Sequence, residues 1–463
     1  MKARSIFLLL LTAFTSLAIS CKKTGFTDSK DAVVFFSEDA LHFDTVFTTA
    51  GSITQSFKIF NANDQKLRIS NIELASGSSS FFKMNVDGTS GTSFSNIEIA
   101  PNDSIYVFVS ATIDPNDDNN PFLIEDSIRI SYNTNETFIK LDAYGQNAHF
   151  LNNAKVTQDT AWGNELPVVI SGVLTVTQGN KLTIEKGTKI YCHAGATINV
   201  NGTLIATGEK YDSTKIIFRN DRLDDYYKDL PASWQGIIFT ESSVDNELSF
   251  ASVLNANNAI TVRNPSANSN PKLTLQQCII DNASHIGLYG IYSSINAVNC
   301  LISNCGQNIK IVAGGNYNFN HCTVAAYSNL FLTHSNPVLF ITDIDDNSQS
   351  FPLTASFTNS IFYGDDGIVD DEISIQQTGS NNFEVSFENV LYKGNTITVD
   401  FINSIQNQGP GFTTIEVFDN LYNFHLQEIS PCISTGINTG TIIDLDGNSR
   451  DESPDIGSYE YQR

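Results

Sequence analysis

Between residues 33 and 148 the chain alternates apolar and polar positions in short runs. Five runs rich in β-branched and aromatic residues lie at residues 56–62, 66–74, 104–113, 126–132 and 137–145. Clusters of Asn, Asp, Gly and Pro, such as "NANDQ" and "DPNDDNNP", separate them and are typical of turns. Short alternating strands at this spacing predict an antiparallel β-sandwich of the Ig-like class. We therefore predict that residues 33–148 form one β-sandwich domain.

From residue 149 the runs become shorter and glycine interrupts them more often. In the segment 174–208 the interruptions fall at Gly179, Gly187, Gly195, Gly202 and Gly208. Each strand is too short for a sandwich, and no later segment has helical periodicity. Recurrent short strands with Gly or Asn corners predict a chain that coils into a parallel β-helix, which we assign to residues 149–424.

Five phrases in this region align with one another. They are "LQQCII", "AVNCLI", "FNHCTV", "FTNSIF" and "FENVLY", which begin at Leu275, Ala297, Phe319, Phe357 and Phe387. Their fourth residues are Cys278, Cys300, Cys322, Ser360 and Val390, and their sixth residues are Ile280, Ile302, Val324, Phe362 and Tyr392. Positions two apart point to the same face of a strand, so we predict that these columns lie inside the coil. The third residues of the last four phrases, Asn299, His321, Asn359 and Asn389, are predicted at corners or facing outward.

The recurring cysteines admit three interpretations. Equivalent residues on stacked strands lie about 4.8 Å apart, so three cysteines in one column form a ladder of small buried thiols. A disulfide, with Cys305 among its candidate partners, is the second interpretation, although parallel Cβ vectors suit S–S geometry poorly. Zinc binding is the third interpretation. Zinc needs four ligands around one point, whereas the residues of a column lie along a line. We predict the thiol ladder.

The N-terminal residues have the pattern of an export signal. Lys2 and Arg4 precede an apolar run, and small residues follow it before Cys21. A signal that ends on cysteine resembles a bacterial lipobox, which implies cleavage before Cys21 and acylation of its thiol. Ordinary cleavage that leaves a free cysteine is the alternative. We predict a lipoprotein signal peptide at residues 1–20 and a polar tether at residues 21–32, with the lipid as the only membrane anchor.

The charge of the chain excludes some partners. The formal net charge is -24 at pH 7, from 50 acidic and 26 basic residues. Binding to nucleic acid or to an anionic membrane surface requires clustered Lys and Arg, so neither is an expected partner. Neutral glycans, envelope proteins and divalent cations are compatible with this charge.

Three stretches resemble parts of right-handed parallel β-helix lipoproteins of Bacteroidota type. They are residues 181–208, 219–239 and 424–461. The last is similar to the C-terminal module called choice-of-anchor Q, whose closing phrase Asp-Ile-Gly-Ala-Tyr-Glu matches Asp455 to Glu460, with Ser458 in place of alanine. The resemblance implies a right-handed coil with a C-terminal cap at residues 425–463. It also implies an outer membrane lipoprotein that faces the cell surface or the periplasm, but no particular activity.

The loop "RLDDYYKD" is a candidate ligand-binding surface. Its candidate residues are Arg222, Asp224, Asp225, Tyr226 and Tyr227. Adjacent tyrosines suit stacking on sugar rings, and the charged side chains suit hydrogen bonds to hydroxyl groups. The alternative is a loop that packs under Trp234 and closes the early turns of the coil.

Two acidic clusters are candidate Ca²⁺ sites, because calcium prefers carboxylate oxygens. The first contains Asp343, Asp345 and Asp346, and the second contains Asp365, Asp366, Asp370, Asp371 and Glu372. Solvated acidic loops are the alternative for both, and no other cofactor is expected.

Signals for catalysis are weak. The Asn-Thr-Asp, Gly-His-Gly and Arg-Ile-Lys phrases of β-helix galacturonan hydrolases are absent, and residues 311–392 contain no Lys or Arg to act as the base of a lyase. We therefore predict a non-catalytic, lipid-anchored envelope protein that presents a rigid β-helix to a glycan or protein. The alternatives are a carbohydrate-active enzyme, such as a Ca²⁺-assisted polysaccharide lyase, and a purely structural envelope component.

Overall fold

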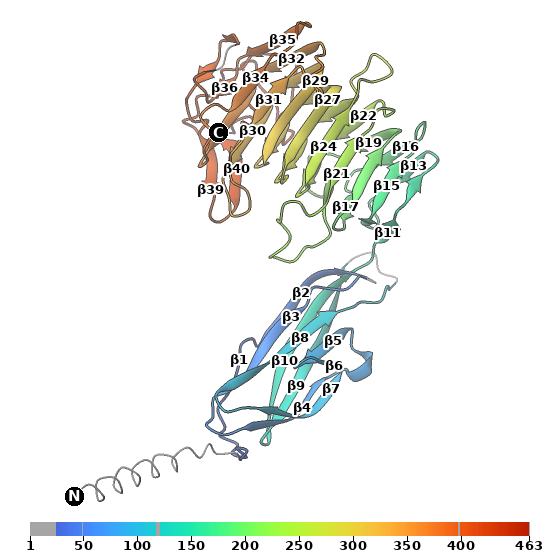
Figure 1. Ribbon diagram of the computed structural model, residues 1–463, viewed down its shortest axis with the longest axis vertical. Coiled ribbons are helices and arrows are strands. Elements are labelled where there is room, and N and C mark those ends of the chain that lie inside the picture. Colours follow the sequence, from blue (N-terminus) through green and yellow to red (C-terminus); the bar gives the residue numbers. More distant parts are fainter. Residues whose placement is uncertain (1–24, 49, 117–120, 397–398, 463) are drawn as a thin grey trace, which may run out of the picture. The chain divides into compact units, whose positions relative to one another are not determined.

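The computed structural model describes residues 25–48, 50–116, 121–396 and 399–462 (Figure 1). The predicted signal peptide and Cys21 lie outside these residues. The chain divides into two compact units, Met1–Asn147 and Ala148–Arg463, and each is described by itself. Apart from a 3-10 turn at Gly77–Ser79, all regular structure in the described ranges is β, which confirms the predicted fold class. No helix in these ranges has the length and apolar character needed to cross a bilayer.

The first unit is a sandwich of two five-stranded sheets. One has the order β1 (Val34–Phe36), β3 (Gln55–Asn61), β8 (Asp103–Ala111), β5 (Phe82–Val86), β6 (Thr89–Gly91). The other has the order β2 (Ala40–Phe47), β10 (Asn135–Gln146), β9 (Phe122–Tyr132), β4 (Leu67–Leu74), β7 (Ser93–Ile99). Neighbours are antiparallel, as predicted, except β2 and β10, which are parallel. A parallel pair requires a long connection, and nearly the whole unit separates these two strands.

The second unit is a parallel β-helix. Its 11-stranded sheet contains β11 (His149–Asn152), β14 (Val168–Ser171), β17 (Lys189–Cys192), β20 (Ile216–Asn220), β23 (Ala251–Leu254), β26 (Ile279–Asp281), β28 (Leu301–Ser303), β30 (Thr323–Tyr327), β33 (Ile361–Asp365), β36 (Leu391–Tyr392) and β38 (Ile405–Gln406), in that order. All neighbours in this sheet run parallel. Because consecutive members are separated by strands of the other sheet, the chain passes through this face once per turn.

A 17-stranded sheet forms the other two faces of the coil. Its strands are β12 (Lys155–Val156), β13 (Thr160–Trp162), β15 (Val173–Val176), β16 (Lys181–Ile184), β18 (Thr197–Val200), β19 (Thr203–Thr207), β21 (Gly236–Phe239), β22 (Asn246–Ser249), β24 (Asn258–Arg263), β25 (Leu273–Gln276), β27 (Ile286–Val298), β29 (Gln307–Asn320), β31 (Leu339–Thr342), β32 (Leu353–Thr358), β34 (Ile373–Gln376), β35 (Phe383–Glu388) and β37 (Phe401–Ile402). The two ladders are separate in the early turns and join where β27 pairs with both β24 and β25.

The predicted interior columns are confirmed residue by residue. Leu275, Ala297, Phe319, Phe357 and Phe387 are register partners on successive turns. Ile280, Ile302, Val324, Phe362 and Tyr392 form a second such series. Both series are buried. In the first series the Phe357 ring stacks on those of Phe319 and Phe387, with centroids 5.2 and 4.8 Å apart. Stacked equivalent side chains therefore form the core of the coil.

The cysteine column is a ladder of free thiols, as predicted. Cys278, Cys300 and Cys322 are buried and none is in a disulfide. Burial, reinforced by its two cysteine neighbours, raises the pKa of the Cys300 thiol well above its usual value. In the described ranges no three His, Cys, Asp or Glu side chains are placed to hold a metal ion. Neither the disulfide nor the zinc interpretation therefore applies to this column.

The predicted corner residues recur on successive turns, each directly before a residue of the cysteine column, and we call them the corner row. Asn299, His321, Asn359 and Asn389 have φ of 51°, 52°, 49° and 52°. Asn and His tolerate this left-handed backbone better than most residues, so they suit a sharp corner. Their side chains point out of the coil but are buried, because the C-terminal segment covers them. Within it, the carbonyls of Ile443, Ile437 and Thr435 accept hydrogen bonds of 2.7–2.8 Å from the three asparagines.

A hairpin covers part of the outer face of the 11-stranded sheet. It consists of β39 (Phe412–Glu416) and β40 (Leu421–Leu426), which pair antiparallel. Phe412 and Phe424 of the hairpin are buried with Leu301 and Tyr327, which point outward from the coil. This second core holds the hairpin against the sheet.

Candidate functional site

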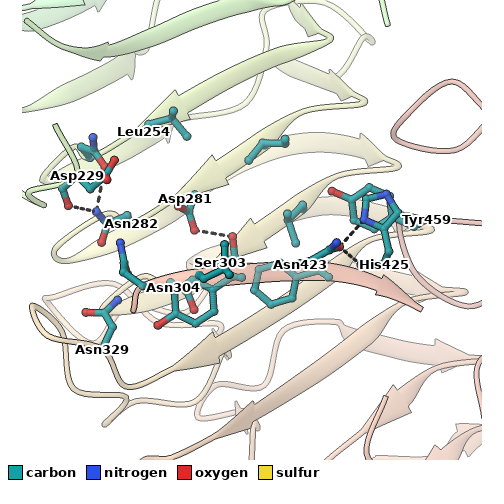
Figure 2. Close-up of a pocket in the computed structure, with 17 residues that line it drawn as sticks. Asp229, Leu254, Asp281, Asn282, Ser303, Asn304, Asn329, Asn423, His425 and Tyr459 are labelled. Atoms are coloured by element: carbon teal, nitrogen blue, oxygen red, sulfur yellow. Dashed lines mark hydrogen bonds between the residues drawn. The ribbon is translucent and has the colours of Figure 1, made fainter. Parts of the chain in front are cut away.

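A pocket of about 540 Å³ lies between the hairpin and the outer face of the 11-stranded sheet. We call it the cap pocket, and we call residues 221–233, which reach one end of it, the platform loop. The cap pocket is lined by Asp229, Leu254, Asn255, Ile279, Asp281, Asn282, Leu301, Ser303, Asn304, Asn329, Asn420, Leu421, Tyr422, Asn423, Phe424, His425 and Tyr459. Figure 2 shows Asp229 at one end and Tyr459 at the other, with Asp281 and Ser303 between them.

Two polar side chains form the centre of the pocket floor. Asp281 and Ser303 occupy the same outward position on adjacent turns, because β26 and β28 pair with these residues in register. Ser303 Oγ donates a hydrogen bond of 2.6 Å to Asp281 Oδ1. Burial raises the pKa of the Asp281 carboxyl to about 6, and Asp229 adds to this rise while the bond from Ser303 opposes it. This carboxyl therefore holds its proton to a higher pH than an exposed aspartate does.

The hairpin supplies an aromatic wall. The rings of Tyr422 and Phe424 stack with centroids 6.1 Å apart, and burial raises the pKa of Tyr422 to about 12. The His425 ring lies 3.9 Å from the Tyr459 ring, and its Nε2 is 2.7 Å from Asp446 Oδ2. The bond to His425 lowers the pKa of Asp446. These contacts fix the wall in place.

A ladder of amides holds the platform loop at the end of the pocket. Asn255 Nδ2 donates to Asn220 Oδ1 at 2.8 Å, and Asn282 Nδ2 donates to Asn255 Oδ1 at 2.9 Å. The same amide groups also donate to the loop backbone, at Lys228 O (2.6 Å) and Asp229 O (2.7 Å). Each of the two amides is thus bonded both along the coil and outward to the loop, so the coil determines the position of the loop.

The five predicted ligand-binding residues lie together in the platform loop, beside the cap pocket. Arg222 Nε donates to Asp224 Oδ2 at 3.0 Å, and its guanidinium lies 3.9 Å from the centre of the Tyr227 ring. Asp225 pairs with a lysine of the same loop at 2.7 Å. These groups therefore bond within the loop. Tyr226 is different, because 76% of its surface is exposed, and its ring forms a T-shaped pair with the Tyr227 ring, with centroids 4.7 Å apart.

The first predicted calcium cluster does not form a common site. Asp343 is buried, and its two carboxylate oxygens accept the backbone N–H groups of Thr378 and Gly379, both at 2.8 Å. Asp345 accepts backbone N–H groups of its own turn, which lower its pKa. Asp346 is exposed. Asp343 and Asp345 thus serve as local turn acceptors.

The second predicted cluster does not converge either, because Asp371 accepts the backbone N–H of Asn395 at 2.5 Å and the buried Glu372 is 2.8 Å from His334 Nε2. Asp365 is 3.6 Å from Lys393, and Asp366 is exposed. As stated for the cysteines, the described part of the chain contains no group of acidic, histidine or cysteine side chains suited to a metal ion. Neither acidic cluster therefore supports a Ca²⁺ site.

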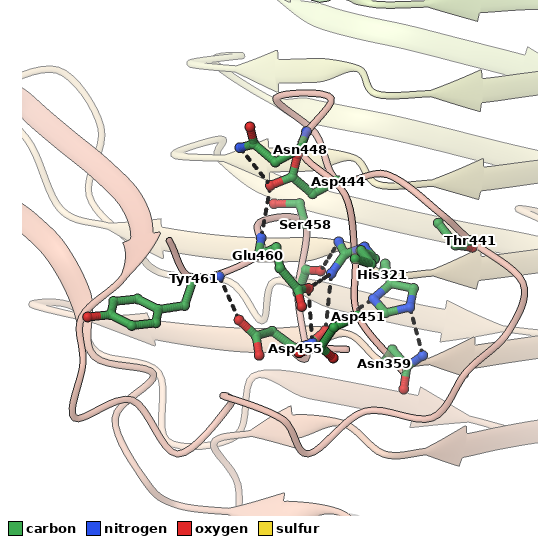
Figure 3. A network of polar contacts seen from close by, with 12 residues as sticks. His321, Asn359, Thr441, Asp444, Asn448, Asp451, Asp455, Ser458, Glu460 and Tyr461 are labelled. Carbon is green, nitrogen blue, oxygen red and sulfur yellow. Dashed lines mark hydrogen bonds and ion pairs between the residues drawn. The ribbon is translucent and has the colours of Figure 1, made fainter. Parts of the chain in front are cut away.

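A second polar cluster joins the C-terminal segment to the coil (Figure 3). Arg450 and Glu460 form a buried ion pair of 2.8 Å, and Arg450 also donates to Asn299 Oδ1 at 2.9 Å. Asp455 accepts the backbone N–H of Tyr461 at 2.6 Å. Burial and the nearby Arg450 lower the pKa of His321 to about 3, so the histidine is neutral. These groups bond chiefly to one another, which indicates that the cluster holds the fold together.

The residues that line the cap pocket were not predicted from the sequence. Asp281 and Ser303 each lie three positions after a column cysteine, Cys278 or Cys300, so a polar residue at a repeated outward position was an available signal. No comparable signal existed for Tyr422, because its place depends on contacts between segments far apart in sequence.

Comparisons with known proteins show no family. No protein-family model and no curated protein sequence matches the chain. Among solved structures, a family 123 glycoside hydrolase from Clostridium perfringens is 10% identical with a TM-score of 0.18, over 26% of each chain. A protein of unknown function from Porphyromonas gingivalis W83 is 8% identical with a TM-score of 0.19, over 27% of this chain and 60% of that one.

A third solved structure covers more of the chain. The catalytic domain of a GH87 alpha-1,3-glucanase is 9% identical with a TM-score of 0.16, over 76% of this chain and 87% of that one. The chain spans only about a quarter of the length of the Clostridium enzyme. Likenesses at these TM-scores indicate nothing about the function of this chain.

Proposed function

We propose that this chain is a lipid-anchored protein of the cell envelope that binds a neutral glycan in the cap pocket. The observation that carries the proposal is the lining of that pocket, which combines amide side chains, two carboxyl groups, a hydroxyl group and tyrosine rings. Amides and carboxylates bond the hydroxyl groups of sugars, and aromatic rings cover their apolar C–H faces. A rigid coil behind the pocket keeps these groups in place and lowers the entropic cost of binding.

Charge favours an uncharged ligand. None of the residues lining the pocket is Lys or Arg, whereas Asp229 and Asp281 are both acidic. A uronate or phosphate group would enter a site with carboxylates and no opposing cation, which is unfavourable at short range. The same argument weakens the predicted polysaccharide lyase, whose substrate is anionic, and the dispersed acidic clusters offer it no Ca²⁺.

The proposal of a lipid anchor is based on the N-terminal sequence pattern alone. Acylation of Cys21 would attach the chain to the outer membrane, facing the surface or the periplasm. Of the predicted tether at residues 21–32, residues 26–30 bond to the sandwich through Lys66, Asn133 and Asn135. Labelling cells with an alkyne fatty acid tests the acylation, because wild-type chain is expected to carry the label and Cys21→Ser is not. Labelling of the serine variant contradicts the anchor and leaves the glycan proposal untouched.

Glycoside hydrolysis is a second candidate, and Asp281 is the observation that favours it. Hydrolysis requires a protonated carboxyl group to donate to the leaving oxygen and a second carboxylate to activate water. Burial raises the pKa of Asp281 to about 6, and Asp229 lines the same pocket. A purely structural envelope component, the third candidate, requires no such pocket.

A glycan array combined with a turnover assay separates these candidates. We expect wild-type protein to bind neutral glycans and Asp281→Ala to lose that binding, while Glu384→Ala, a change at an exposed carboxylate on β35 outside the pocket and the platform loop, binds normally. New reducing ends released from bound glycans by wild type but not by Asp281→Asn favour hydrolysis. Unsaturated products from uronate polymers favour the lyase, and absence of binding to every neutral glycan contradicts the proposed function.

A further inference from the structure

We infer that the glycan is an extended chain of several sugar units, of which one enters the cap pocket and the next cross the exposed ring of Tyr226. This inference rests on the proposed function and adds the length of the ligand and a second contact surface. It assigns to Tyr226 a part in specificity that the pocket alone does not provide.

Continuity between the pocket and Tyr226 is the first step. Asp229 lines the pocket and stands at the end shown in Figure 2. Tyr226 precedes it by three residues in the same loop, and three residues span at most about 11 Å even when extended. The loop turns back on itself between them, since Leu230 N–H donates to Tyr227 O at 3.1 Å. The backbone of Tyr226 therefore lies within about 11 Å of Asp229, within reach of a ligand that leaves the pocket at this end.

The second step is the state of the Tyr226 ring. The Arg222 guanidinium lies over the neighbouring Tyr227 ring, 3.9 Å from its centre, so this face of Tyr227 is not available to a ligand. Tyr226 is T-shaped against Tyr227, and 76% of its surface is exposed. An aromatic ring with open faces offers what the C–H face of a sugar requires. Tyr226 is a candidate contact because it is exposed and is three residues from Asp229, which lines the polar pocket.

Rigidity is the third step. The amide ladder bonds the loop backbone on both sides of the tyrosine pair, since Asn220 Nδ2 donates to Arg222 O (2.8 Å) and Asn282 Nδ2 donates to Asp229 O (2.7 Å). Trp234 is fully buried directly after the loop and donates to Leu254 O at 2.9 Å. A ring held on a fixed loop loses little freedom when a ligand stacks on it.

The test measures affinity against ligand length. Fluorescently labelled oligomers of one to eight units from α-mannan, β-1,4-xylan, α-1,4-glucan and β-1,3-glucan serve as probes. For the series that binds, wild type is expected to gain affinity as the chain grows beyond the unit in the pocket. Tyr226→Ala is expected to lose that gain, about two- to ten-fold for the longer oligomers, and to bind the shortest oligomer as wild type does.

Two further variants make the result specific. Tyr226→Phe is expected to behave as wild type, because the proposed contact uses the ring and not the hydroxyl group. Tyr211→Ala removes another exposed tyrosine, 62% exposed and outside the platform loop, and is expected to change nothing. Long oligomers that bind Tyr226→Ala as tightly as wild type, or a wild-type affinity that does not grow with length, overturn the inference alone. If wild type binds none of the four series, the proposed function fails and this inference fails with it.

Discussion

Asp281 and Ser303 lie at the same position of adjacent turns, and the serine hydroxyl is 2.6 Å from the aspartate carboxylate. No Lys or Arg is among the residues that line the pocket around them. The ionised carboxylate is therefore partly withdrawn from water with neutral donors but no cation to compensate it, which costs stability. Such costs are common at binding sites, where a residue serves a ligand and not the fold.

Replacement of Asp281 by Asn is expected to stabilise the protein at pH 7 but not at pH 4. The folded-state pKa of about 6 lies above the ordinary value of 3.8, so folding favours the bound proton. That contribution is present below about pH 4 and is lost as the pH rises through 6, whereas asparagine does not titrate. We expect the free energy of unfolding at pH 7 to increase by about 1–3 kcal/mol, measured by urea unfolding at both pH values.

Its control is Asp225→Asn, which changes a carboxylate whose side chain is 90% exposed in the same unit. That variant is expected to unfold as wild type at both pH values. An Asp281→Asn protein that gains equal stability at pH 4 and pH 7 shows that the ionised carboxylate is not the cause.

Replacement of Ser303 by Ala is expected to raise the pKa of Asp281 further. The serine hydroxyl stabilises the ionised form, so its removal favours the protonated form. A carbon-detected NMR titration of the Asp281 carboxyl measures the midpoint directly. Ser252→Ala, at an outward serine on β23, is expected to leave it unchanged. A midpoint that falls in Ser303→Ala is incompatible with the bond described here.

Replacement of Arg450 by Met is expected to lower the free energy of unfolding by about 3–5 kcal/mol, since it leaves the buried Glu460 carboxylate without its cation. Arg450→Met combined with Glu460→Gln is expected to recover much of this loss. The Lys186–Glu209 pair, whose side chains are half exposed, provides the comparison, and Lys186→Met is expected to cost less than about 1 kcal/mol. Denaturant unfolding measures all three, and equal costs at both sites argue against a buried pair.

Replacement of Cys300 by Leu is expected to cost about 1–3 kcal/mol, because the column between Cys278 and Cys322 has no room for a longer side chain. Cys300→Ser is expected to cost less, since Ser360 already occupies an equivalent place in the column. Thermal unfolding measures both. The column thiols are also expected to react with a thiol reagent only after unfolding, and a reducing agent that shifts the unfolding midpoint of wild type would point to a disulfide.

The architecture could be predicted because it repeats. Phe319, Phe357 and Phe387 are equivalent in sequence and stack in space, so a one-dimensional pattern contains the three-dimensional neighbours. The parallel pairing of β2 with β10 could not be predicted, because nothing local in either strand specifies a partner about a hundred residues away.

The candidate site was predicted only in part. The platform loop was recognised by its adjacent tyrosines, but the pocket beside it requires the hairpin, which packs through Phe412 and Phe424 onto turns of the coil much earlier in the sequence. Composition also misled in one case. Asp343 sits in an acidic stretch typical of calcium ligands, yet two backbone N–H groups occupy its carboxylate.

The corner row has a consequence for how such a protein changes over generations. Cys300 and Cys322 are 22 residues apart, whereas Cys322 and Ser360 are 38 apart, yet β28, β30 and β33 on these turns pair in continuous register. The additional residues lie between β30 and β31 and between β31 and β32, whereas the corner row itself keeps its conformation at His321 and Asn359. Gain or loss of residues in these connections can therefore change the binding surface of such a protein, while the strands of the 11-stranded sheet keep their register.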